Sequence, residues 1–229
     1  MPCRVPNRSE RDKTETMKHT ETDVKAVMAE ILEAESRAIA AIPVSEAYGR
    51  AVSLIVEHVH RRGGTLITSG MGKAGQIAMN IATTFCSTGT PAHFLHPSEA
   101  QHGDLGIMRG EDVMLLISNS GKTREILELV ELARRLNPGV PAIVITGGAD
   151  SPLAAKADVC LYTGGAPEVC PLGLTPTTST TAMTVIGDVL VVAVMREIGF
   201  TSAQYALRHH GGYLGHKSSM QSAGEHNAS

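Results

Sequence analysis

Small hydroxyl residues, an asparagine and a glycine gather in one short stretch, Ser118-Asn119-Ser120-Gly121-Lys122-Thr123. The stretch follows the apolar run 113–117 and precedes a helical pattern that starts near Arg124, which predicts a strand–loop–helix junction. Such a junction presents side-chain hydroxyls and backbone N–H groups at the positive end of a helix dipole. Phosphate is the anion most often bound by this arrangement. A purely structural turn, in which Thr123 caps the helix, is the alternative.

A second candidate is the glycine turn Gly70-Met71-Gly72-Lys73-Ala74-Gly75, which matches the dinucleotide pattern G-x-G-x-x-G. The acidic residue that a nicotinamide site needs is absent, because the next strand ends in Leu95-His96-Pro97. A P-loop is excluded because Ile67 occupies a position that must be glycine. The turn presents Lys73 at a helix N-terminus, where a cation opposes the helix dipole unless an anion is bound. A solvated lysine is the alternative.

Two further stretches are unusually polar. Residues 96–106 contain two histidines, Glu99 and Asp104, but their spacing matches no closed structural metal site. They form either a metal cluster or an ordinary polar loop. Residues 175–181 place more hydroxyls before a long helix than one N-cap requires. These hydroxyls either bind a polar ligand or bond back to the preceding turn.

Alternating strands and helices must position these stretches. Helices are predicted from Asp23 and from Ser45, and a short helix near Ser151. The remaining predicted elements are strands at 65–69, 92–95, 113–118, 142–146 and 159–162, and helices at 73–88, 123–136 and 177–198. This order predicts a single α/β domain with a doubly wound, mostly parallel five-stranded sheet flanked by helices, a flavodoxin/Rossmann-like three-layer sandwich. Ligands bind such sheets at the carboxyl ends of the strands, where the polar stretches lie.

The composition indicates which kinds of binding partner and which cellular compartment to expect. A net charge of −3 gives no reason to expect nucleic acid or an acidic membrane surface. No apolar run reaches about 18 residues, so we expect no membrane span. Residues 1–21 lack the apolar core of a secretion signal and are predicted to be a disordered lead-in, and 218–229 a frayed polar tail. Four scattered cysteines suit a reducing cytoplasm.

Several motifs together carry a resemblance to a known family. They are the two loops above, His-Pro-Ser-Glu-Ala-Gln-His-Gly-Asp-Leu-Gly at 96–106, Cys-Pro-Leu-Gly-Leu-Thr-Pro-Thr-Thr-Ser-Thr-Thr at 170–181 and His-His-Gly-Gly-Tyr-Leu-Gly at 209–215. From about residue 25 to about 217 the chain resembles the SIS (sugar isomerase) family, in particular its arabinose-5-phosphate isomerases. The resemblance predicts an SIS domain over 22–217. Many relatives continue into paired CBS domains, and we expect a short form without them.

The resemblance implies a reversible exchange between D-arabinose 5-phosphate and D-ribulose 5-phosphate through an enediolate, the first step of Kdo synthesis for lipopolysaccharide. No cofactor is required. The implied catalytic residues are Lys73, Glu125, Glu168 and His209. The implied substrate-binding residues are Gly72, Gly89, Thr90, His102, Ser118, Asn119, Ser120, Thr123, Thr177 and Ser179. His96 matches a histidine that takes an inhibitory divalent metal in relatives.

The resemblance also implies a cytoplasmic homotetramer in which sites are shared between subunits, so that His209 acts on a neighbour's substrate. Which of Glu125 and Glu168 is the proton-transfer base stays open. His210 stands where many relatives have proline, and Tyr213 where a small residue is usual, so the resemblance leaves the fine substrate selectivity open. The alternatives are an isomerase for a hexulose or heptulose phosphate and a non-catalytic module that senses a sugar phosphate.

Overall fold

The computed structural model describes residues 23–211, 213–215, 217–218 and 220. The predicted lead-in 1–21 lies outside these residues, as does the predicted tail 218–229 except for Ser218 and Met220.

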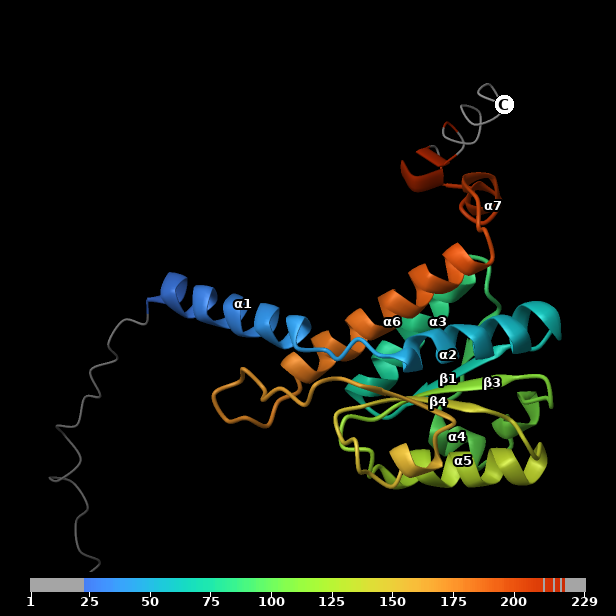
Figure 1. Cartoon of the computed structure of the whole chain (residues 1–229), viewed down its shortest axis with the longest axis horizontal. Helices are drawn as coiled ribbons and strands as arrows, with labels where there is room; N and C mark the ends of the chain where they lie inside the picture. The colour runs from blue at the N-terminus through green and yellow to red at the C-terminus, as the bar shows by residue number, and fades with distance from the viewer. Residues whose placement is uncertain (1–22, 212, 216, 219, 221–229) are drawn as a thin grey trace, which may run out of the picture.

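A five-stranded parallel sheet forms the centre of the molecule, as the sequence predicts (Figure 1). Its strands are β1 (Leu66–Gly70), β2 (Ala92–Phe94), β3 (Val113–Ile117), β4 (Ala142–Thr146) and β5 (Val159–Tyr162). Every residue of β1, β3 and β4 is buried, because helices cover both faces. The strand β3 and the first four residues of β4 are therefore continuous apolar runs, whereas β1 ends in Thr68, Ser69 and Gly70. The strand order is β2-β1-β3-β4-β5, so the winding direction reverses between β1 and β3. A ligand crevice is expected at the carboxyl ends of these two strands.

Two hydrophobic cores lie on the two faces of the sheet. Figure 1 shows α2 (Glu46–Ile55), α3 (Lys73–Ser87) and α6 (Thr178–Glu197) on one face, and α4 (Pro97–Ala100) and α5 (Arg124–Leu136) on the other. The helix predicted at 123–136 is confirmed as α5, which is amphipathic and buries Ile126, Val130 and Ala133 against the sheet. The three-layer arrangement is confirmed as well.

Short elements complete the fold. The loop predicted at 96–106 is partly helical, because α4 is followed by the 3-10 turn η2 (Asp104–Ile107). The short helix predicted near Ser151 is the 3-10 turn η3 (Ala154–Lys156). Ser45 caps α2 as predicted, since its hydroxyl accepts from the Ala47 amide. The end of that helix widens into the π-helical turn η1 (Val56–Arg61).

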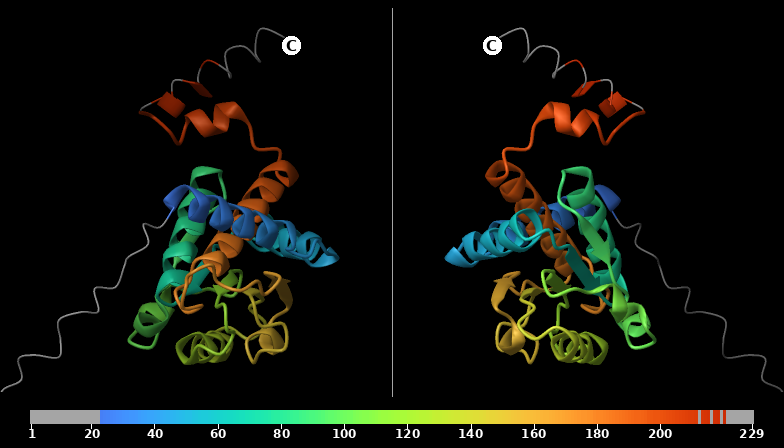
Figure 2. Two further views of the ribbon diagram at one scale, coloured as in Figure 1. Left: turned by 90° about the vertical axis from the view of Figure 1, so that its left-hand side faces the viewer. Right: turned by 90° about the vertical axis from the view of Figure 1, so that its right-hand side faces the viewer.

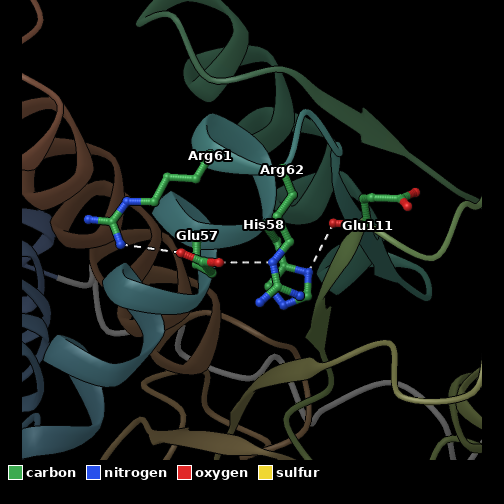
Figure 3. Close-up of polar contacts among 5 residues, drawn as sticks. All are labelled: Glu57, His58, Arg61, Arg62 and Glu111. Atoms are coloured by element: carbon green, nitrogen blue, oxygen red, sulfur yellow. Dashed lines mark hydrogen bonds and ion pairs between the residues drawn. The ribbon is translucent and has the colours of Figure 1, made fainter.

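One polar contact ties η1 to the segment before β3, and two more join Glu57 to arginines at the end of the turn (Figure 3). His58 Nδ1 lies 2.9 Å from the Glu111 carbonyl oxygen. The Glu57 carboxylate accepts from Arg61 at 3.2 Å and from Arg62 at 2.9 Å, and these hydrogen bonds hold the pKa of Glu57 below its usual range. A Cβ on Gly64 would lie 2.3 Å from the Glu111 carbonyl oxygen, so only glycine permits this approach. The contacts fix η1 at the amino edge of the sheet, where β1 and β3 begin.

Two helices lie outside the layers, at opposite ends of α6. The helix α1 (Val24–Ala40) extends outward near the start of α6, and α7 (Ser202–Ala206) follows its end (Figures 1 and 2). Asp23 caps α1 through its carboxylate. Of the residues of α1, only Ala38 is buried. The helix carries an apolar stripe at helical spacing that faces outward, with Val24, Met28 and Leu32 each more than half exposed.

The helix α6 passes through the core. It is the one helix in the described part of the chain that is long and apolar enough to cross a membrane, a composition that the sequence analysis did not identify. Half of this apolar window is buried inside the protein, where α6 packs against α2 and α3, while Val189 and Val192 remain exposed. A Cβ on Gly187 would lie 2.3 Å from Ile81 of α3, so this glycine lets the two helices approach closely.

Candidate functional site

A cavity of about 380 Å³ opens at the carboxyl ends of β1 and β3. Three stretches that are separate in the sequence meet in it: the glycine turn 70–75, the loop 118–123, which we call the hydroxyl loop, and the start of α6. The lining residues are Met71, Lys73, Ala74, Ile117, Ser118, Asn119, Ser120, Thr123, Pro176, Ser179, Thr180 and Met183. The cavity lies where the topology predicts a ligand site.

The hydroxyl loop leaves donors at the start of α5. Thr123 occupies the N-cap position of α5 but makes no capping bond, since its hydroxyl lies 3.0 Å from Ser118 Oγ instead. The Ser120 hydroxyl accepts from the Lys122 amide at 3.2 Å. Gly121 has a φ of +60°, and a Cβ there would lie 2.0 Å from Ser151 Oγ. The loop therefore needs glycine, and its hydroxyls and amides are arranged for an anion rather than for capping.

Lys73 supplies the positive charge. It is the first residue of α3, which follows Gly72 at a φ of +59° without a side-chain cap. Within the described residues, no ion pair or hydrogen bond engages its ammonium group. A cation at a helix N-terminus is unfavourable unless a negative charge accompanies it. An anion bound in the cavity would provide that charge.

Glu168 is bound to the start of α6 (Thr178–Glu197). Its carboxylate accepts from the Thr177 amide at 2.7 Å and hydroxyl at 3.0 Å, and from the Ser179 amide at 3.2 Å and hydroxyl. Burial by itself would raise the pKa of Glu168, but the hydrogen bonds from Ser179 and Thr177 outweigh it and hold the pKa below the usual value. Glu168 is therefore ionised at neutral pH, and Ser179 connects it to the cavity.

Glu125 lies in the first turn of α5, two residues after Thr123. Its carboxylate lies 3.8 Å from the Arg124 guanidinium and is about one quarter exposed. Glu125 is not among the residues that line the cavity. Glu168 does not line the cavity either, but its carboxylate is hydrogen-bonded to Ser179, which does. Among the described contacts, the Glu125 side chain has none with a lining residue.

His96 and His102 flank α4. The Nδ1 atom of His96 is buried and has no partner among the described residues, whereas His102 is exposed. Nowhere in the described chain do three or more histidine, cysteine or acidic residues gather in a way that could hold a metal. His96 is thus a single donor in one chain, which by itself does not fit a metal site, and an inhibitory divalent metal at this residue stays a prediction.

Gly89 and Thr90 lie away from the cavity. They follow α3, whose 15 residues span about 22 Å from Lys73. Thr90 is buried and bonded to His60 Nε2 at 3.0 Å, and Gly89 packs against Phe200. Within one chain these two implied substrate-binding residues therefore do not lie beside the hydroxyl loop, because the length of α3 carries them to the other end of the molecule. Their role in binding substrate stays a prediction that needs a second copy.

His209 also lies at that end. Its ring stacks on Tyr205 at 3.7 Å between centroids, and Nδ1 lies 3.0 Å from the Tyr205 carbonyl oxygen. The 20 residues of α6 separate this region from Ser179 by about 30 Å. One chain therefore does not bring His209 to its own cavity.

Sequence reasoning missed Glu35 of α1. Its Oε1 atom accepts from the hydroxyl of Thr178, 143 residues away, at 3.1 Å. Glu35 stands four residues from both Ile31 and Ile39, so it falls on the apolar face of the helix. An acidic residue at such a position was the signal that could have identified it.

Comparison with protein families gives a match to the SIS domain over residues 60–193. Arabinose 5-phosphate isomerase KdsD of Shigella flexneri is 52% identical over 154 residues, which cover 67% of this chain and 46% of the relative. KdsD of Salmonella typhi is 45% identical over 188 residues, which cover 82% and 56%. The chain thus spans about half the length of the curated relatives that it matches.

Two solved structures are similar along nearly their whole length. A candidate phosphosugar isomerase involved in capsule formation from Bacteroides fragilis is 65% identical, with a TM-score of 0.82 over 83% of this chain and 99% of that one. An Escherichia coli CFT073 protein, solved in complex with arabinose 5-phosphate, is 34% identical, with a TM-score of 0.75 over 82% and 98%.

Proposed function

Since this chain belongs to the SIS domain family, we propose that it is an aldose–ketose isomerase that interconverts D-arabinose 5-phosphate and D-ribulose 5-phosphate. The names of the KdsD relatives and the sugar-phosphate complex of the Escherichia coli CFT073 protein support this choice of substrate. The reaction opens the sugar ring, moves a proton between C1 and C2 and passes through an enediolate. No redox cofactor takes part.

The observation that carries the proposal is the cavity that unites Lys73 with the hydroxyls of Ser118, Ser120 and Ser179. A phosphate bound to the hydroxyl loop would accept hydrogen bonds from the loop and face the positive end of α5. Lys73, across the cavity, would stabilise the negative charge that develops on the oxygens at C1 and C2. One end of the substrate would thus be held while the other end reacts.

Glu168 is our choice for the proton-transfer base. Hydrogen bonds keep its carboxylate ionised, as a base requires, and it contacts Ser179 in the cavity wall. Glu125 has no such contact with the cavity lining, and we assign it a secondary, electrostatic role. His209 is proposed to act on the ring oxygen, because an imidazole can serve both as a general acid and as a general base.

A second copy of the chain has to supply His209, and we propose a homotetramer with shared sites. Two observations support this: His209, Gly89 and Thr90 lie far from the cavity of their own chain, and α1 exposes an apolar stripe. Apolar surface of this kind marks interaction sites. We place the enzyme in the cytoplasm at the first step of Kdo synthesis.

A substrate panel tests the proposal. The purified protein is incubated with pentose, hexose and heptose phosphates, and both isomers are quantified. We expect turnover of arabinose 5-phosphate above all others. Turnover of a hexulose or heptulose phosphate alone would reassign the substrate. Binding without turnover, unchanged in Glu168→Gln, would make the protein a sugar-phosphate sensor instead.

A further inference from the structure

We propose that Glu35 of α1 is a positioning residue for this reaction: through the hydroxyl of Thr178 it holds the segment that carries Glu168 against the start of α6. The inference rests on the proposed isomerase function, in which Glu168 transfers the proton. It assigns a role to α1, a helix that lies outside the three layers of the fold (Figure 1).

The contact is a directed chain of hydrogen bonds. The Val169 amide donates to Thr178 Oγ1 at 3.2 Å, and Thr178 Oγ1 lies 3.1 Å from Glu35 Oε1. An amide can only donate, so the hydroxyl accepts from Val169 and has its single hydrogen left for Glu35. Thr178 is 1% exposed, so water does not compete for these bonds. Glu35 therefore determines the orientation of the hydroxyl that fixes Val169.

Val169 is the neighbour of Glu168, and Thr178 lies between the two residues that bind Glu168. Thr177 and Ser179 donate to the Glu168 carboxylate, while Thr178 turns its hydroxyl towards α1. Consecutive residues at the start of α6 thus hold consecutive residues of the loop. Loss of the Glu35 contact would free the Thr178 hydroxyl to rotate and would loosen the loop at the residue next to the base.

The second oxygen of Glu35 argues against a purely structural role. Its Oε2 atom is buried and has no partner among the described residues. An unpaired buried carboxyl oxygen is unfavourable, and an apolar or singly bonding side chain would join α1 to α6 at lower cost. Few other side chains anchor this helix, because Ala38 alone among the residues of α1 is buried. The Glu35 contact is therefore the polar connection between the position of α1 and the loop.

The test compares variants at both ends of the chain of bonds. Glu35→Ala and Thr178→Val remove the bond, Glu35→Gln keeps an acceptor, and Thr178→Ser keeps the hydroxyl. Glu33→Ala is the matched control, because Glu33 lies on the exposed side of α1, where it pairs with Arg37. Each variant is assayed for kcat and KM with arabinose 5-phosphate. Hydrogen exchange is followed without substrate in peptides spanning residues 165–176 and, as a reference for global unfolding, 113–117.

We expect Glu35→Ala and Thr178→Val to lower kcat about tenfold with KM changed less than twofold, because the base and not the phosphate site is disturbed. Glu35→Gln and Thr178→Ser should stay within about threefold of wild type, and Glu33→Ala should match it. Exchange in 165–176 should accelerate about tenfold in the first two variants, while 113–117 stays protected.

Unchanged exchange in 165–176, or an equal loss of kcat in Glu33→Ala, would overturn the proposal. Accelerated exchange in both peptides would overturn it as well, since Glu35 would then only stabilise the fold. If the wild-type protein does not turn over arabinose 5-phosphate, the isomerase assignment fails, and the exchange measurement still decides whether Glu35 holds the loop.

Discussion

The amino and carboxyl edges of the sheet differ in whether their polar side chains have hydrogen-bond or ion-pair partners within the protein. At the amino edge, Asp112 is fully buried and accepts from the Thr65 amide at 2.8 Å and the Arg109 amide at 2.7 Å. Asp158 joins β4 to α5 in the same way, by accepting from the Ala142 amide and from Arg134. These charged groups have partners within the protein.

At the carboxyl edge, several polar groups have no partner within the described part of the chain and are available to a ligand. Lys73 has no ion-pair partner in the described part of the chain, and α3 and α5 begin without side-chain caps. Glu168, the one carboxylate bound there by four hydrogen bonds, is held ionised rather than neutralised. The difference indicates that polar groups at the amino edge stabilise the fold, whereas those at the carboxyl edge are available to bind a ligand.

Among the substitutions that test this difference between the edges, Glu168→Gln is expected to have the largest effect on activity. The amide retains one acceptor for the start of α6 but cannot take up a proton, so kcat should fall about 10³-fold while the protein stays folded. Steady-state kinetics and a melting curve measure the two properties. A variant that retains a tenth of wild-type kcat would remove Glu168 from the role of base and leave it as a cap.

Asp112→Ala tests the opposite edge. The substitution leaves the amides of Thr65 and Arg109 buried without an acceptor, and we expect a loss of about 3 kcal/mol in the free energy of unfolding. Urea denaturation measures this loss. Activity per folded molecule should not change. A stable but inactive variant would show that the two edges are not functionally separate.

Lys73→Met should lower kcat/KM about 10²-fold, because the charge facing the developing oxyanion is lost. The melting temperature should stay equal or rise, since the wild-type cation opposes the dipole of α3. Assay and calorimetry together separate this result from a folding defect. Reduced stability with full activity would identify Lys73 as a surface residue.

The smallest expected effect is the contribution of Glu168 to the pH dependence of stability. Its pKa is lowered in the folded protein, where hydrogen bonds from Ser179 and Thr177 exceed the opposing effect of burial. A lowered pKa contributes stability that is present above the unfolded value and is lost as the pH falls through the folded value. The melting temperatures of wild type and Glu168→Gln should therefore converge below about pH 4.5, the ordinary value for glutamate. A gap that widens on acidification would contradict the assignment.

Most of the sheet and part of the site were predictable from the sequence. The bounds of all five strands lie within one residue of the prediction, because short apolar stretches bounded by turn residues mark buried parallel strands. The short α4 and α7 were not predicted as helices, since segments of so few residues show no helical period. The meeting of Lys73 with the hydroxyl loop followed from the topology, as parallel strands bring their carboxyl ends to one edge.

By itself the sequence determined the order of strands and helices, the edge of the sheet that carries the chemistry and the kind of ligand expected there, because periodicity, glycine turns and hydroxyl clusters act over a few residues. Only the tertiary structure decided that Gly89, Thr90 and His209 lie far from the cavity of their own chain and that Glu35 reaches Thr178. These outcomes depend on the lengths and directions of whole helices, which set distances between residues that no local pattern relates.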